Sequence, residues 1–220
     1  MLTIALLSLL HVLVFVYWLG GDLGAFYASR YLTKPGVSAD RRLFAATMVG
    51  DVDMAPRTSL ILALPTGLSL AQAKGWLNLG WPVVLGVSAV SVAWLAIAWV
   101  RHLNHAANPV FGTVDMALRW GLAGGLIFAA AASFAGLISI PLFLAVKFLA
   151  LAGCVLLGLI IRRTLTPLFP ALGALSAGGD TADAEVTIAN TLAQARPQVK
   201  AIWTLLLIAA LFGLWAPASF

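Results

Sequence analysis

Six apolar stretches of about 20 residues each limit what this chain can fold into. Hydrophobic residues make up 62% of its 220 residues and charged residues only 10%, and the mean hydropathy is +1.01. An apolar segment of this length crosses a bilayer as a helix, because a helix satisfies its own backbone polar groups in lipid. The sequence therefore predicts an all-α, polytopic membrane bundle of about six transmembrane helices, forming a single integral membrane domain over residues 1–220. The predicted spans are 2–20, 54–74, 80–101, 117–138, 141–161 and 199–217.

The positions of the basic side chains predict the orientation of this bundle. Eleven of the 13 Lys and Arg residues lie in or beside three predicted connections, 21–53, 102–116 and 162–198. Because cytoplasmic connections are enriched in Lys and Arg, we expect these three to be cytoplasmic and both termini to be external. The eleven are Arg30, Lys34, Arg41, Arg42, Arg57, Arg101, Arg119, Arg162, Arg163, Arg196 and Lys200.

The same distribution argues against nucleic-acid binding. The net charge of +5 and the pI of about 9.9 would suit a nucleic-acid partner, but the basic residues sort by predicted membrane side and form no patch with interleaved aromatic residues. The single cysteine, Cys154, lies in an apolar run, so we expect a buried thiol and no internal disulfide. No basic region precedes the N-terminal run, which favours a retained first helix over a secretory signal.

A histidine on the first predicted helix is the main candidate for a functional site. Phe15, Trp18 and Asp22 follow His11 at i+4, i+7 and i+11, so the four side chains share one helix face. An ionisable side chain inside a membrane is costly unless it faces a cavity or a partner, and by default it indicates function. The alternative is a structural histidine that is hydrogen-bonded to a neighbouring helix.

Two basic residues carry similar alternatives. Arg57 follows Asp53 at i+4, which predicts an ion pair at the membrane surface, but it is also placed to line a pocket with Asp22. Lys147 lies only about 9 Å of helix rise from Pro141, so its amine can reach the outer surface by snorkelling. Alternatively, Lys147, His11 and Trp18 frame a cavity for an aromatic or anionic molecule in the outer half of the bilayer.

The other two histidines lie at the far end of the third predicted helix. His102 and His105 are spaced i,i+3, which allows both to contribute to a metal site. His11 is expected near the middle of the membrane and these two near its inner boundary. The separation of about 12–15 Å along the membrane normal is too large for opposed ligands of one haem.

Several local patterns make further structural predictions. Pro65 should kink the second helix. Gly121, Gly125, Ala129 and Ser133 follow one another at four-residue spacing, which predicts a seam of close helix packing. In the last connection, Asp180 should cap a short helix that runs through Gln194 and ends at Pro197.

Part of this pattern resembles a known family. His11, Trp18 and Gly21 form an H-x6-W-x2-G arrangement that is followed by Phe26, Tyr27 and Arg30. The stretches RRLFAATMVGDVDMAPRTSLILALPTGLSLA, PLFLAVKFLALAGCVLLGLIIRRTL and RPQVKAIWTLLLIAALFGLWAP resemble later helices of the same group. The resemblance is to HemJ-type protoporphyrinogen oxidases and, more loosely, to CopD-like copper-resistance membrane proteins. It covers about two-thirds of the chain.

This resemblance implies a multi-pass protein of the bacterial cytoplasmic (inner) membrane that holds haem b and carries out a redox reaction on a porphyrinogen or quinone-like substrate, with electrons passed on to the membrane. It implies that His11 is a ligand of the haem iron or a group that contacts the porphyrin, with Trp18 and Asp22 beside the cofactor. It further implies that Lys147 and Arg57 attract the propionates, which makes His11, Lys147 and Arg57 the candidate catalytic residues. The family pattern has two further histidines, one after the first helix and one two residues before the lysine, where this chain has none.

Two other functions stay open at this point. A CopD-like copper protein would use histidine and methionine ligands, for which Met48, Met54 and Met116 are available in the inner half. A non-catalytic accessory subunit would pack into a larger membrane complex, or into a homo-oligomer, through the Gly121 seam and the 162–198 connection. A haem protein should lose its colour when His11 is replaced, whereas an accessory subunit should lose nothing chemically.

Overall fold

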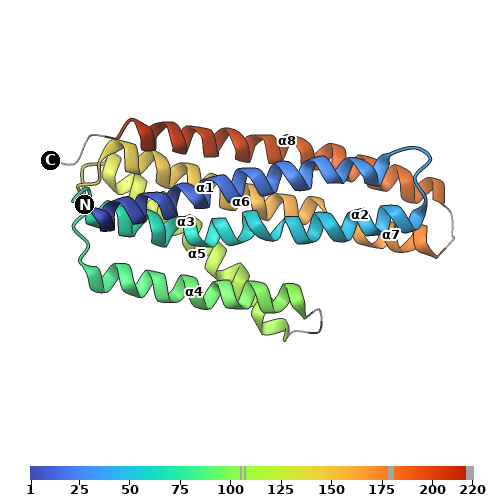
Figure 1. Cartoon of the computed structure of the whole chain (residues 1–220), viewed down its shortest axis with the longest axis horizontal. Helices are drawn as coiled ribbons and strands as arrows, with labels where there is room; N and C mark the ends of the chain where they lie inside the picture. The colour runs from blue at the N-terminus through green and yellow to red at the C-terminus, as the bar shows by residue number, and fades with distance from the viewer. Residues whose placement is uncertain (105, 107, 178–180, 217–220) are drawn as a thin grey trace.

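The computed structural model describes the whole chain except residues 105, 107, 178–180 and 217–220, and its described residues form helices without any strand (Figure 1). This confirms the predicted all-α class. The elements are α1 (Leu2–Ala28), η1 (Ser29–Thr33), α2 (Ala39–Val52), α3 (Met54–Ala73), α4 (Trp81–Leu103), α5 (Pro109–Phe134), α6 (Leu142–Thr164), α7 (Leu168–Ser176) and α8 (Thr181–Leu214).

Among the described residues, five helical segments are long and apolar enough to cross a membrane, at 2–33, 81–103, 109–134, 142–176 and 182–214. The predicted second span, α3, is less apolar because it lies inside the bundle, packed against α1 and α4. Its buried residues include the polar Ser59 and Thr66 together with Leu60 and Ile61. A helix that contacts protein in place of lipid can carry such polar groups when they find hydrogen-bond partners. The chain is therefore a polytopic membrane helix bundle.

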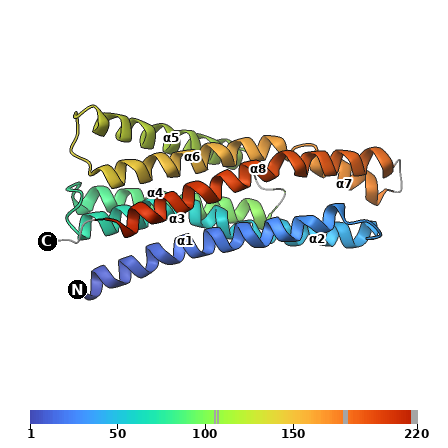
Figure 2. The same cartoon turned by 90° about the horizontal axis from the view of Figure 1, so that it is seen from above.

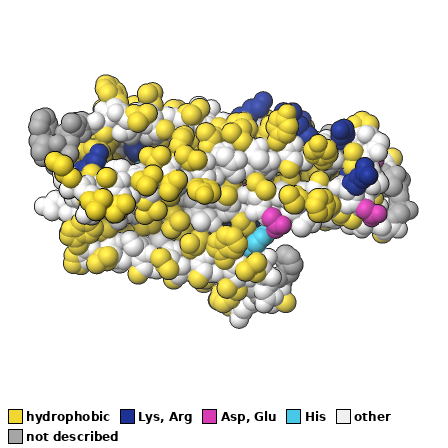
Figure 3. All heavy atoms as spheres, in the orientation of Figure 1, with side chains coloured by type: hydrophobic (Ala, Val, Ile, Leu, Met, Phe, Trp, Pro, Cys, Tyr) yellow, Lys and Arg dark blue, Asp and Glu magenta, His cyan; other side chains and the backbone are white. Residues whose placement is uncertain are grey.

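Long parallel and antiparallel helices build this bundle. Figures 1 and 2 show α1, α3, α6 and α8 running along its length, with α4 at one side and α5 crossing from α6 towards α4. The start of α1 and the end of α8 lie at the same end, as an even number of crossings requires. Hydrophobic side chains cover most of the face in Figure 3, and most of its Lys and Arg gather towards the end that holds α2 and α7.

That end has a small hydrophobic core of its own, built from η1, α7 and the first half of α8. Arg42 of α2 is buried beside it and forms an ion pair of 2.9 Å with Glu185 of α8. The core consists of Leu32, Leu168, Ala171, Leu172, Leu175, Ala184, Ile188 and Leu192.

The helix boundaries correct two sequence-based expectations. One continuous helix, α8, contains Pro197, so the short helix ending there and the span after it are a single element. Proline removes one backbone hydrogen bond, but buried residues on both sides of it, Ile188 and Ile202, hold the same helix in place. Asp180, the expected cap, lies outside the described residues. The connection between α4 and α5 is also shorter than the predicted connection 102–116. α5 already starts at Pro109, and the side chain of Asn108 before it accepts a 2.9 Å hydrogen bond from the Val110 amide.

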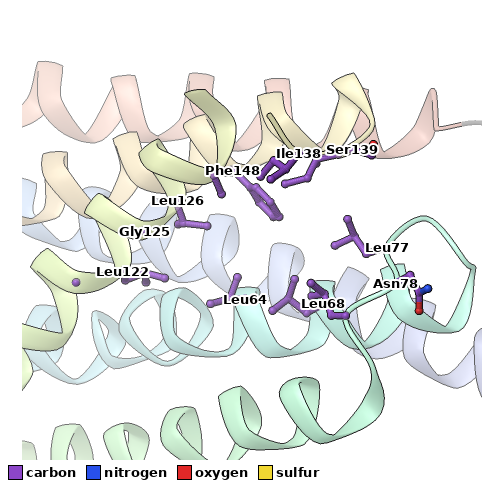
Figure 4. A pocket seen from close by; sticks show the side chains of 14 residues that line it. Leu64, Leu68, Leu77, Asn78, Leu122, Gly125, Leu126, Ile138, Ser139 and Phe148 are labelled. Carbon is purple, nitrogen blue, oxygen red and sulfur yellow. The ribbon is translucent and has the colours of Figure 1, made fainter. Parts of the chain in front are cut away.

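Within the chain, the predicted seam on α5 does not form a close helix contact at Gly121 or Gly125. No neighbouring heavy atom lies within 4 Å of where a Cβ would stand at Gly121 or Gly125. Both glycines instead line an apolar cavity of about 660 Å³ between α3, α5 and α6, which Figure 4 shows with Leu64, Leu68, Leu126 and Phe148 around it. The small side chains therefore leave space open and do not bring two helices together.

Candidate functional site

The expected functional face of α1 points into the bundle. Val14 and Trp18 are the buried residues of this helix, and His11, Phe15 and Asp22 are partly buried. Trp18 is only 3% exposed and belongs to the central hydrophobic core with Leu60 and Ile61 of α3. Trp18 therefore packs as a core residue, about two helical turns along α1 from His11.

The imidazole of His11 is held by a hydroxyl group of α3. Nδ1 of His11 lies 2.9 Å from Oγ1 of Thr66, and the same oxygen lies 2.7 Å from the carbonyl oxygen of Leu62. A hydroxyl has one proton to donate, and the short contact to the carbonyl, which can only accept, uses it. Thr66 therefore accepts from Nδ1–H of His11, and Nε2 of the ring keeps its lone pair.

A glycine next to Thr66 makes room for this ring. A Cβ at Gly67 would stand 3.1 Å from Cε1 of His11, so the imidazole lies directly on the helix backbone. At the other end of the same helix pair, a Cβ at Gly21 would stand 2.5 Å from Cδ of Pro56. Both glycines thus permit a close approach of α1 and α3, and the approach fixes the height at which His11 meets Thr66.

Lys147 of α6 points towards α8. Its Nζ atom lies 2.8 Å from where a Cβ would stand at Gly213. Among the described residues, no carboxylate pairs with Lys147 and no hydrogen-bond acceptor meets its amine. An amine that is partly buried without a counter-ion is a candidate binding group for an anion.

Arg57 forms the local ion pair that its spacing predicts. Arg57 donates from Nε to Asp53 Oδ2 at 2.6 Å, which confirms the i,i+4 ion pair. Asp22 lies near Asp53, and its buried Oδ2 atom has no hydrogen-bond partner among the described residues. One turn further along α1, Phe26 packs edge-on against Trp203 of α8, whose buried Nε1 is also without a partner in the described part of the chain.

His102 belongs to a different part of the molecule. Its Nε2 lies 3.2 Å from Oδ1 of Asp51, and its ring packs edge-on against Trp99 near the end of α4. His105, the second predicted ligand, lies outside the described residues. Within the described part of the chain, no three His, Cys, Asp or Glu side chains gather as a metal site. Of the three methionines considered as copper ligands, Met54 is buried, and Met48 and Met116 are exposed.

A buried ionic cluster was missed in the sequence. Asp115 of α5 is 2% exposed and accepts a 2.8 Å hydrogen bond from Nε1 of Trp94. Its carboxylate also accepts from three arginines, Arg119 at 3.1 Å, Arg162 at 2.9 Å and Arg101 at 3.4 Å. The i,i+4 spacing of Asp115 and Arg119 could have predicted their ion pair. The prediction of a connection over 102–116 separated Asp115 from the helix that contains Arg119.

Comparisons of the chain with protein-family models, with curated proteins and with solved structures found no match. The resemblance to HemJ-type and CopD-like proteins therefore stays a prediction, and the side-chain geometry around His11 is the basis for a functional proposal.

Proposed function

We propose that this membrane bundle binds haem b with Nε2 of His11 as an iron ligand and acts as a redox protein on a porphyrinogen or quinone-like substrate. The observation that carries the proposal is the hydrogen bond between His11 and Thr66. Histidines that bind metals usually donate their other ring N–H to a fixed acceptor, which sets the tautomer and the ring orientation. His11 has this arrangement inside a helix that faces the bundle interior.

Lys147 supports the porphyrin in particular. The propionates of a haem are anions, and the Lys147 amine has no carboxylate partner among the described residues. Arg57 is a weaker candidate for the same role, because Asp53 already neutralises its guanidinium. We therefore assign the propionate contact to Lys147.

The proposal relies on His11 as the one histidine ligand. His102 lies near the end of α4, at a membrane level about 12–15 Å from the one expected for His11, so we do not assign it as the opposite ligand. The bound haem would supply the electron-transfer chemistry, and the residues around His11 would hold and orient it. The oxidoreductase role follows from the resemblance together with this geometry.

An absorption spectrum tests the proposal. Protein is produced with ample haem, purified in detergent, and measured in the oxidised and then the dithionite-reduced state. We expect a Soret band that is lost in His11→Ala and weakened in Thr66→Val, whereas the control His102→Ala keeps it. A wild-type protein without a Soret band contradicts the proposal.

The same samples separate the two competing functions. A copper protein should contain copper in metal analysis of wild-type protein and lose it in His11→Ala. An accessory subunit should show neither colour nor metal, and it should co-purify with other membrane subunits equally in both forms.

A further inference from the structure

The cluster around Asp115 carries more positive charge than its single carboxylate neutralises. Arg101, Arg119 and Arg162 all donate to this group, and no other carboxylate pairs with them in the described part of the chain. Two formal positive charges are therefore left over. Inside or beside a membrane, such a surplus needs a counter-ion.

The surplus lies on the two arginines that reach the surface. The side chains of Asp115 and Arg119 are 3% and 5% exposed, whereas those of Arg101 and Arg162 are 39% and 35% exposed. Arg101 and Arg162 donate through one nitrogen each to the same oxygen, Oδ2 of Asp115, so their guanidinium groups are neighbours. Each guanidinium has five N–H donors, which leaves several on each for an external anion.

Exposed apolar side chains lie close in sequence to these two arginines. Arg101 and Arg162 lie in the last turns of α4 and α6, at the ends that the positive-inside rule places in the cytoplasm. At this level a bilayer presents phosphate groups, with acyl chains directly beneath them. The exposed apolar side chains nearby in sequence on the same three helices are Val100, Leu103, Val110, Met116 and Ile160.

We propose that Arg101 and Arg162 form a binding site for the phosphate headgroup of an anionic phospholipid. Paired guanidinium groups suit a phosphate diester, because each can donate two parallel hydrogen bonds to its oxygens. Oδ2 of Asp115 accepts a hydrogen bond from both guanidinium groups and orients them. Trp94 and Arg119 in turn donate to Oδ1 of Asp115 and hold its carboxylate in place. The occupied site would join α4 to α5 and α6, the three helices that contribute to the cluster. This site is independent of the proposed haem site.

Thermal unfolding with defined lipids tests the site. The protein is purified in a neutral detergent, and its tryptophan fluorescence is followed on heating in mixed micelles that contain phosphatidylglycerol or phosphatidylcholine. We expect phosphatidylglycerol, but not phosphatidylcholine, to raise the midpoint in proportion to its mole fraction. Equal effects of the two lipids would overturn the proposal.

Two matched double variants assign the effect to these arginines. Arg101→Gln with Arg162→Gln should weaken the apparent affinity for phosphatidylglycerol about tenfold or more, because a hydrogen bond between charged groups contributes roughly tenfold or more to an affinity. Arg41→Gln with Arg163→Gln removes the same charge from two exposed positions and should leave the affinity within about twofold. Equal losses in the two double variants would show general charge attraction and overturn the site.

A second pair of measurements covers the remaining outcomes. If the glutamine variant does not unfold cooperatively, Arg101→Lys with Arg162→Lys keeps the charge but loses the paired donors, and it should still bind several-fold more weakly than wild type. Inorganic phosphate at matched concentration should give no comparable shift. A shift as large as that of the lipid would reassign the site to a free anion and overturn the phospholipid.

Discussion

Oγ1 of Thr66 lies between two groups, 2.9 Å from Nδ1 of His11 and 2.7 Å from the carbonyl oxygen of Leu62. Thr66→Val keeps the side-chain shape and removes the acceptor of the imidazole N–H. An unsatisfied buried donor costs about 1–3 kcal/mol, so we expect a loss of this size in the free energy of unfolding in detergent. Thr66→Ser keeps the hydroxyl and should lose much less.

Thr204→Val is the control for this comparison. Thr204 is exposed and donates only to the carbonyl oxygen of Lys200, so its replacement removes the same local bond without affecting a histidine. We expect a change of less than about 0.5 kcal/mol, as is usual at surface positions. If Thr66→Val and Thr204→Val cost the same, the His11 contact contributes nothing to stability.

Two adjacent glycines of α1 should respond very differently to a methyl group. At Gly21 a Cβ would meet Pro56 at 2.5 Å and Ala55 at 2.9 Å, whereas at Gly20 nothing lies within 4 Å. Overpacking at a tight contact typically costs about 1–3 kcal/mol, so Gly21→Ala should lower the unfolding midpoint and Gly20→Ala should not. A heat-unfolding experiment on both variants decides this, and similar midpoints would mean that α1 and α3 lie further apart.

Hydropathy alone was enough to predict the fold class, because long apolar runs have few alternatives in lipid. It was also predictable that His11, Trp18 and Asp22 share one helix face and that this face points into the bundle. The helical period places the three residues on one side, and the cost of polar groups in lipid turns that side inward. The ion pair of Asp53 and Arg57 was predictable because residues spaced i,i+4 are neighbours on one helix. Each of these inferences needs only one helix.

Features that depend on two or more helices were not predictable in the same way. Gly121 and Gly125 have the spacing of a packing seam, but a spacing does not show whether a partner helix is present, and here a cavity is. Asp115 falls within the predicted connection 102–116, and its partners Trp94 and Arg162 come from other helices. Which side chains meet depends on tertiary packing, and a single sequence does not specify it.

The cavity beside α5 reverses the expectation for Gly125. As a seam residue it should not tolerate leucine, but its side of the helix is open and lined by Leu122 and Leu126. Gly125→Leu should therefore leave the unfolding midpoint unchanged or raise it, because filling apolar space adds contacts and removes a glycine from a helix. A drop of several degrees in a detergent unfolding assay would restore the packing interpretation.

Loss of the Asp115 carboxylate should be far more damaging than loss of an exposed one. Asp115→Asn leaves Arg119 buried without its counter-ion, and breaking a buried pair in this way typically costs about 3–5 kcal/mol. The control is Asp53→Asn, which breaks the partly exposed pair with Arg57 and should cost no more than about 1 kcal/mol. Denaturant unfolding of both variants at equal detergent concentration gives the comparison, and equal losses would mean that water reaches the Asp115 cluster.

Asp22 should behave in the opposite way, because its buried Oδ2 atom has no partner among the described residues. Burying a polar group without a hydrogen bond costs about 1–3 kcal/mol on the scale of protein mutations, so Asp22→Leu should raise the free energy of unfolding by a similar amount. A chain that keeps such a destabilising group is typically using it for function. Under the proposed function, we therefore expect the stabilised variant to bind less haem or to lose redox activity, measured by its visible spectrum and by quinone reduction. A fall in stability would show instead that a group outside the described residues, or a bound water, already satisfies Asp22.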